Sequence, residues 1–202
     1  MKKAVVVCLL CVGLYLLWQS WATRSETIAL DGSGYELTYT VAWGWSMQER
    51  VSLAKPGQPS SDSDWIELFE KPYNSGVAVY QTADGRAYYL GLLYHTMRFD
   101  PASGVLDVLC RKPEEVAYTA EARFAAKDNR LRADTGAPSL FEYVDGDWLG
   151  ASTGTPVASK YYADLLYLGR FGVLDGNFRG ADIGFQPAAA PESQMALDAS
   201  CD

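Results

Sequence analysis

One histidine, His95, limits the nucleophilic chemistry that this chain can perform. A Ser-His-Asp arrangement would have to use His95 as its base. The sequence has no His-Glu-x-x-His, no phosphate-binding glycine loop and no dinucleotide fingerprint. His95 directly follows an apolar segment, so we expect it at the end of a strand. A hydrolase that uses His95 or paired carboxylates stays a minor hypothesis, and the protein is more simply a non-enzyme.

Two acidic segments, 145–156 and 175–186, begin like calcium-binding loops. Such loops need an oxygen ligand at position five and a bidentate glutamate at position twelve. Position five is Leu149 in one segment and Arg179 in the other, and neither segment has glutamate at position twelve. Asp-Gly pairs are also typical of hairpin turns. We therefore predict turns here, with no metal and no cofactor.

Aromatic residues are abundant: 13 Tyr, 6 Trp and 7 Phe make up 13% of the chain. Tyrosine and tryptophan dock on proteins and stack on sugars at a low entropic cost. The alternative is a β core with tyrosine hydroxyls at its rim. The candidate binding residues lie on the predicted strand 87–94, directly after it, or in the predicted helix 157–168: Tyr88, Tyr89, Tyr94, His95, Tyr161 and Tyr162. Tyr88 and Tyr94 share one strand face, and Tyr89 points the other way.

Strands and turns must position these residues. Residues 35–43 alternate apolar and polar side chains, and the Asp31–Gly34 turn joins them to 27–30 in a predicted hairpin. Residues 76–81 and 87–94 flank Asp84-Gly85 in a second hairpin. A third turn, 100–104, precedes a strand that extends to residue 110. We therefore predict an antiparallel meander over 76–110.

The remaining segments are less regular. Residues 55–64 are a polar loop, and 116–124 and 140–144 are strand candidates, although an acidic helix start at 113–115 competes with the first. Residues 157–168 have the spacing of a helix. The predicted fold class is mainly β or α+β: an antiparallel sandwich or curled sheet with one or two helices, preceded by an N-terminal apolar export segment.

The N-terminus has the pattern of an export signal. Lys2 and Lys3 precede an uncharged segment, 4–18, and small residues at Ser20 and Ala22 fit a cleavage site before Thr23. The alternative is an uncleaved anchor over residues 4–21, with tryptophans at the outer interface. Both place the rest of the chain outside the cytoplasm, in the periplasm or cell envelope, and the second anchors it to the inner membrane.

Three regions follow from this pattern. They are a signal peptide or anchor at 1–22, a single β-rich domain at 23–186 and a tail at 187–202. Export would leave Cys110 and Cys201 as the cysteines of the mature chain, and an oxidising compartment favours a disulfide between them. This disulfide would pin the tail, although a buried Cys110 and a free Cys201 are the alternative.

The net charge of −8 makes nucleic acid an improbable partner and favours a basic one. Removal of residues 1–22 would take away two lysines and no acids. We therefore expect an exported, non-enzymatic envelope protein that binds a partner protein. An inhibitor or toxin-neutralising protein with an acidic, aromatic-bearing surface fits this description. The alternative is a small-ligand or glycan-binding module, or a structural accessory of an envelope complex.

Overall fold

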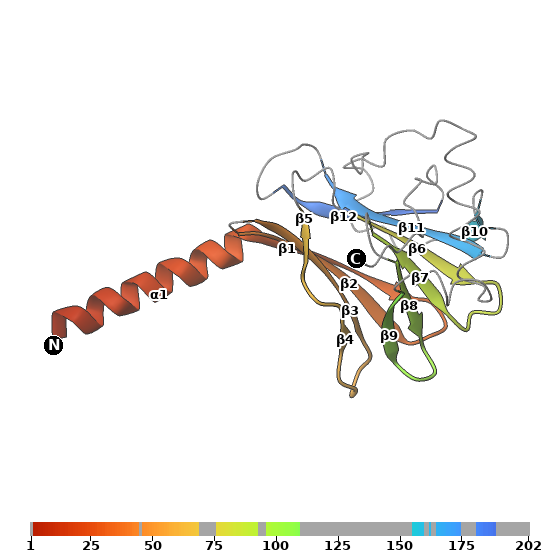
Figure 1. The fold of residues 1–202 in the computed structure, drawn as a ribbon, viewed down its shortest axis with the longest axis horizontal. Coiled ribbons are helices and arrows are strands. Elements are labelled where there is room, and N and C mark those ends of the chain that lie inside the picture. The colour runs from red at the N-terminus through yellow and green to blue at the C-terminus, as the bar shows by residue number, and fades with distance from the viewer. Residues whose placement is uncertain are drawn as a thin grey trace.

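A computed structural model describes residues 2–44, 46–68, 76–92, 96–109, 155–159, 162, 165–174 and 181–188. One helix is followed by strands that form two antiparallel sheets, as Figure 1 shows. The elements are α1 (Lys2–Ala22), β1 (Thr23–Leu30), β2 (Tyr35–Trp43), β3 (Met47–Ala54), β4 (Ser61–Asp62), β5 (Ile66–Leu68), β6 (Val77–Thr82), β7 (Tyr88–Gly91), β8 (Thr96–Asp100), β9 (Val105–Leu109), β10 (Val157–Ala158), β11 (Leu165–Val173) and β12 (Ile183–Pro187).

The first sheet has the order β1-β2-β3-β4, and β5 also pairs with β3. The predicted first hairpin is confirmed: β1 and β2 pair without interruption from Leu30↔Tyr35 to Thr23↔Ala42. The sequence analysis predicted no strand at β3, and it placed β4 within a polar loop. Along β3, buried and half-buried residues alternate, so this strand also has one face inside the protein.

The second sheet has the order β10-β11-β6-β7-β8-β9, and β12 also pairs with β11. The predicted meander is confirmed, because β6, β7, β8 and β9 are consecutive antiparallel neighbours. Asp84-Gly85 and residues 101–104 lie in the turns that the sequence predicts.

The helix predicted over 157–168 is wrong. Residues 157–158 form β10, and β11 begins at Leu165. All but one of the β11 residues are buried, because β11 lies between β6 and β12 and is covered on both faces. A strand buried on both faces loses the alternation that would distinguish it from a helix. The strand candidates 116–124 and 140–144, and residues 145–154 and 175–180 of the two predicted turn segments, lie outside the described residues.

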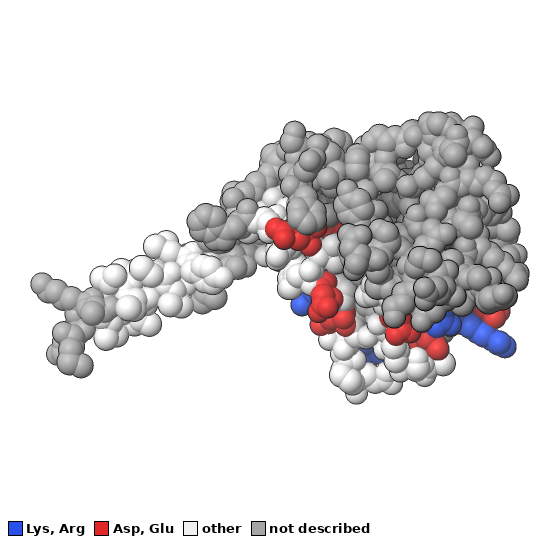
Figure 2. Space-filling model, in the orientation of Figure 1, with Lys and Arg blue, Asp and Glu red and all other residues white. Residues whose placement is uncertain are grey.

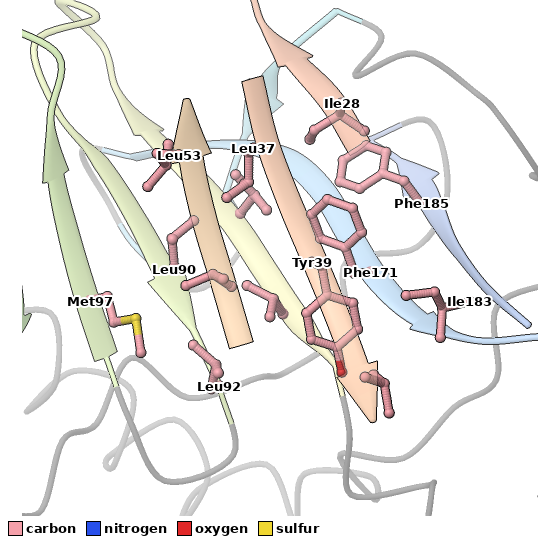
Figure 3. Packing of buried hydrophobic residues seen from close by; sticks show 14 of the residues in the cluster. Ile28, Leu37, Tyr39, Leu53, Leu90, Leu92, Met97, Phe171, Ile183 and Phe185 are labelled. Carbon is pink, nitrogen blue, oxygen red and sulfur yellow. The ribbon is translucent and has the colours of Figure 1, made fainter. Parts of the chain in front are cut away.

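The main core lies between the two sheets (Figure 3). Aromatic rings join the sheets: Tyr39 of β2 lies 5.4 Å from Phe171 of β11, which lies 4.9 Å from Phe185 of β12. Tyr35 contacts Phe99 edge-on at 4.8 Å. The fold is therefore mainly β, with two antiparallel sheets packed as in a sandwich.

A second cluster lies on the other face of the β6–β7–β11 sheet. The register places Tyr167, Tyr80 and Tyr89 side by side on three neighbouring strands. All members of the cluster are buried: Ala78, Tyr80, Ala87, Tyr89, Tyr162, Leu165, Tyr167 and Ala188. The β6–β7–β11 part of this sheet thus carries buried apolar residues on both faces.

Helix α1 extends away from the sheets (Figure 1). Its described apolar side chains are 55–66% exposed on every side of the helix: Val5, Val6, Val7, Leu9, Leu10, Val12, Leu14 and Tyr15. Cys8 and Cys11 are exposed and free. Within the described residues, no helix reaches the length and apolar character that crossing a membrane requires.

Candidate binding surface at the turn end of the sandwich

Four turns gather at one end of the sandwich, which we call the turn end: residues 31–34, 55–60, 83–87 and 101–104. Hairpin geometry brings them together. Glu36 pairs with Ala54, so the turns that flank β2 and β3 are neighbours in the first sheet. Tyr88 pairs with Phe99, so the 83–87 turn before β7 and the 101–104 turn after β8 are neighbours in the second sheet. In Figure 1 this end lies on the side of the molecule away from α1.

Tyr88 connects the two sheets at the turn end. Its ring is buried in the main core, and its hydroxyl donates to the Asp31 carbonyl at 3.3 Å. The Gln81 side-chain amide donates to the same hydroxyl oxygen at 3.0 Å. Burial raises the pKa of Tyr88 above its usual value, and the nearby Asp31 adds to this effect. Tyr88 therefore stays a neutral donor that fixes the 31–34 turn against β6 and β7.

Tyr35 connects the other two turns. Its hydroxyl donates to the Gln58 side chain at 3.0 Å, and the Lys55 ammonium lies 5.3 Å from its ring. A Cβ at Gly104 would lie 2.8 Å from the Tyr35 hydroxyl oxygen, and Gly104 has φ of +70°. Glycine at this position therefore permits both the turn conformation and the close approach of the tyrosine.

Aspartates fix the conformation of the turns in the second sheet. Asp84 accepts hydrogen bonds from the Thr82 hydroxyl at 2.7 Å and from the Arg86 amide at 3.1 Å, which hold its pKa below the usual value. Asp100 accepts from the Ala102 amide at 2.8 Å. Such side-chain bonds stabilise turns locally. The backbone of the turn end is therefore organised before any partner arrives.

The four turns themselves carry two acidic and two basic side chains, and Asp84 forms a 3.4 Å ion pair with Arg86. Acidic side chains outnumber basic ones at the turn end when the exposed acids beside the turns, Glu36 and Asp62, are included. Asp31 and Asp84 are exposed in the turns, and Asp62 is exposed beside them on β4. Lys55 and Arg86 are the basic side chains of the four turns. Figure 2 shows acidic and basic side chains along this rim of the sandwich. A negative potential over fixed turns favours a basic protein surface.

The candidate binding residues predicted from sequence do not form one surface. Tyr88 is buried between the sheets and reaches the turn end with its hydroxyl. Tyr89 and Tyr162 lie in the second cluster, where Tyr162 contacts the Tyr80 ring edge-on at 5.1 Å. The opposite orientation of Tyr88 and Tyr89 agrees with the predicted strand parity. The other proposed residues lie outside the described part of the chain: Tyr94, His95, Tyr161, Cys110 and Cys201.

Sequence reasoning missed a buried carboxyl group, Glu49 of β3. Its side chain is 0% exposed and points into the main core. Tyr39 donates a hydrogen bond to Oε2 at 2.8 Å, and the Gly76 amide donates to the same atom at 3.2 Å. Burial raises the pKa of Glu49 to about 8. The alternation of Met47, Glu49 and Val51 is the signal that could have found it.

Glu49 lies at the end of the sandwich opposite the turn end. It pairs with Val41, close to the end of β2, and Gly76 directly precedes β6. The hydrogen bond to Gly76 therefore joins the first sheet to the backbone of the second. A carboxyl group with this pKa is mostly neutral at pH 7, and its burial keeps it from a dissolved substrate. Its chemistry is that of a structural acid whose charge depends on pH.

No three His, Cys, Asp or Glu side chains gather as metal ligands in the part of the chain that the structure describes.

No model of a known protein family matches the chain. No solved structure matches it at a significant level.

Proposed function

We propose that this chain is an exported, non-enzymatic envelope protein that binds a basic partner protein through the turn end. The observation that carries the proposal is the arrangement of the molecule: an exposed apolar helix leaves one end of a sandwich, and fixed turns with exposed aspartates form the other end. An inhibitor or toxin-neutralising protein requires such a surface and no catalytic group of its own.

Helix α1 supports the export part of the proposal. Its apolar side chains are exposed, and apolar surface of this extent is typical of segments that contact lipid, export machinery or another protein. Ala22 leads directly into Thr23, the first residue of β1, which pairs with Ala42 at the end far from the turns. A segment held at the envelope by α1 would therefore direct the turn end outward.

The turn end supports the binding part. Turns that hydrogen bonds already fix lose little conformational entropy on binding, so more of the contact energy appears as affinity. Exposed aspartates accelerate the encounter with a basic partner, and this acceleration weakens as salt screens it. A protein that blocks a basic cleft needs both a preorganised surface and electrostatic attraction to its partner.

The test begins with affinity recovery of the tagged full-length chain from the native cell envelope, at low and high salt, with mass spectrometry of the eluate. We expect a stoichiometric basic protein that is lost at high salt. Recovery of no protein at either salt would overturn the proposal and would favour a glycan or small ligand instead.

A matched pair of variants then locates the surface on the recovered complex. Asp62→Lys changes an exposed acid beside the turn end, and Glu67→Lys makes the same charge change on β5, where Glu67 pairs with Gln48 far from the turns. We expect Asp62→Lys to raise the Kd about tenfold and Glu67→Lys to raise it about twofold or less. Equal effects would mean that net charge, and not the turn end, governs binding.

A further inference from the structure

Strand β9 forms an open edge of the second sheet. Among the described residues it pairs only with β8, over five residues from Asp100↔Val105 to Thr96↔Leu109 and without a bulge. The side chains of Val105 and Val108 are 45% and 46% exposed. β9 is thus a regular strand with accessible apolar side chains.

The hydrogen-bonding groups of β9 alternate between β8 and the outside. The Leu106 amide donates to the Ser61 hydroxyl of β4 at 3.2 Å, so Leu106 directs its backbone groups away from β8. In an antiparallel ladder every second residue shares this direction. The amide and carbonyl of Val108 therefore also face outward, and no described residue forms a hydrogen bond with them.

Among the described residues, the edge lacks the usual protection against strand addition. Natural edge strands are blocked by lysine, proline, a bulge or a covering segment. β9 contains Val105, Leu106, Asp107, Val108 and Leu109, of which only Asp107 is charged. The neighbouring β4 of the other sheet is only two residues long and meets β9 near Leu106, so no strand in the described part of the chain pairs with the outer edge of β9 at Val108.

The two faces of β9 specify what would fit beside it. Leu106 packs on the main core, and Val108 shares its face. Val105 and Asp107 lie on the opposite face, and Asp107 is exposed and forms no ion pair with a described residue. A strand added at this edge would place alternate residues next to Val108 and next to Asp107. Apolar residues suit the positions next to Val108, and basic residues suit the positions next to Asp107.

We propose that β9 binds an extended segment of the partner protein, with alternating apolar and basic residues, as an added strand of the second sheet. The inference deepens the proposed function and rests on it for the identity of the partner. The backbone bonds of Val108 supply affinity, and Asp107 selects a basic segment over an acidic one. A second copy of this acidic chain fits less well, because strand pairing around Asp107 would bring two aspartates together.

The test uses a synthetic peptide, acetyl-Lys-Val-Lys-Val-Lys-Val-Lys-amide, and the full-length chain in a non-ionic detergent. Hydrogen exchange of the Val108 amide, followed by NMR, reports added backbone bonds. We expect saturating peptide to slow this exchange about tenfold or more, and the peptide in which Glu replaces Lys to leave it unchanged. Equal protection by both peptides, or protection that rises with protein concentration without peptide, would overturn the proposal.

Val108→Pro removes an outward amide without breaking the β8–β9 ladder, because proline is tolerated where the amide faces away from the sheet. Peptide titration followed at other β8 and β9 amides should show the Kd raised about tenfold or more by Val108→Pro. Val105 is as exposed as Val108, but its backbone groups bond to β8. The control variant Val105→Thr should therefore change the Kd about twofold or less. Val108→Lys, which keeps the backbone donor and repels a basic peptide, should also weaken binding if Val108→Pro unfolds the strand.

Failure of strand addition at β9 can be distinguished from failure of the proposed function. If the recovered partner binds Val108→Pro and the unchanged chain equally, strand addition is wrong and the turn-end proposal stands. If no partner is recovered, the peptide titration still decides whether β9 accepts a basic strand.

Discussion

Replacing Glu49 with glutamine tests the electrostatics of the main core. Between pH 4.5 and pH 8 the folded chain keeps a proton on Glu49 that the unfolded chain has released. The free energy of unfolding therefore falls as the pH rises, because the folded state binds more protons. The contribution of Glu49 is fully present below pH 4.5 and is lost as the pH rises through about 8.

The magnitude follows from the two pKa values. The ordinary value is 4.5 and the folded value is about 8. Each pH unit of difference corresponds to about 1.4 kcal/mol, so the full loss is on the order of 5 kcal/mol. This is a large part of the stability of a typical domain, which is about 5–15 kcal/mol.

Glutamine keeps an oxygen that can accept from Tyr39 and Gly76, and it cannot ionise. Glu49→Gln should therefore cost a roughly constant free energy at all pH values and remove the steep pH dependence. Between pH 5 and pH 8 the variant should gain about 3–4 kcal/mol relative to the unchanged chain. Urea unfolding of the full-length chain, followed by tryptophan fluorescence at pH 5, 6, 7 and 8, measures this difference.

Glu36→Gln is the matched control, because Glu36 is an exposed acid on the neighbouring strand β2. Its pH profile should follow that of the unchanged chain. The reasoning fails if Glu49→Gln keeps the original slope, or if carbon-detected NMR finds that the Glu49 carboxyl titrates near 4.5.

Three further substitutions test the turn end and the sheet junction by urea unfolding. Gly104→Ala should destabilise the chain by about 1–3 kcal/mol, because its Cβ would meet the Tyr35 hydroxyl at 2.8 Å in a left-handed conformation; an unchanged midpoint would show that the turn can shift. Tyr88→Phe should cost about 1 kcal/mol by removing the hydrogen bond to the Asp31 carbonyl, and a cost near zero would mean that water replaces it. Arg24→Ala, which removes a 2.9 Å ion pair whose acid is mostly exposed, should cost about 0.5 kcal/mol or less; a loss of several kcal/mol would contradict this.

The first hairpin could be predicted from sequence because it has one polar face and a recognisable turn, whereas the β6–β7 hairpin is buried on both faces and was recognisable from its apolar segments and its Asp-Gly turn. Residues 35–43 alternate strictly, and Asp-Gly occurs at both the 31–34 and 83–87 turns. Period-two patterns survive when one side of a strand faces water. The first hairpin and the four-stranded meander therefore followed from local chemistry alone.

Strand β11 could not be predicted because its alternation is hidden. Gly169 lies at a register shift between β11 and β6, with φ of +143°. A side chain there would collide with the Gln186 carbonyl and the Phe185 ring of β12. The glycine reflects close packing between strands that are distant in sequence, and no local pattern records it.

Strand β3 was missed for a different reason. Glu49 occupies an inward position and interrupts the apolar alternation that would have marked the strand. Its hydrogen-bond partners come from β2 and from the residue before β6, so the site exists only after both sheets form. The turn end is likewise assembled from four hairpins, and only the separate turns could be recognised in the sequence.

The most direct test of partner binding at the turn end is the hydrogen-exchange footprint of the recovered partner on the full-length chain. We predict that amides in residues 31–34, 55–60, 83–87 and 101–104 become protected, while those in β5 and at the α1 end of β2 do not change. Protection centred on α1, β5 or Trp43, with the four turns unchanged, would contradict it.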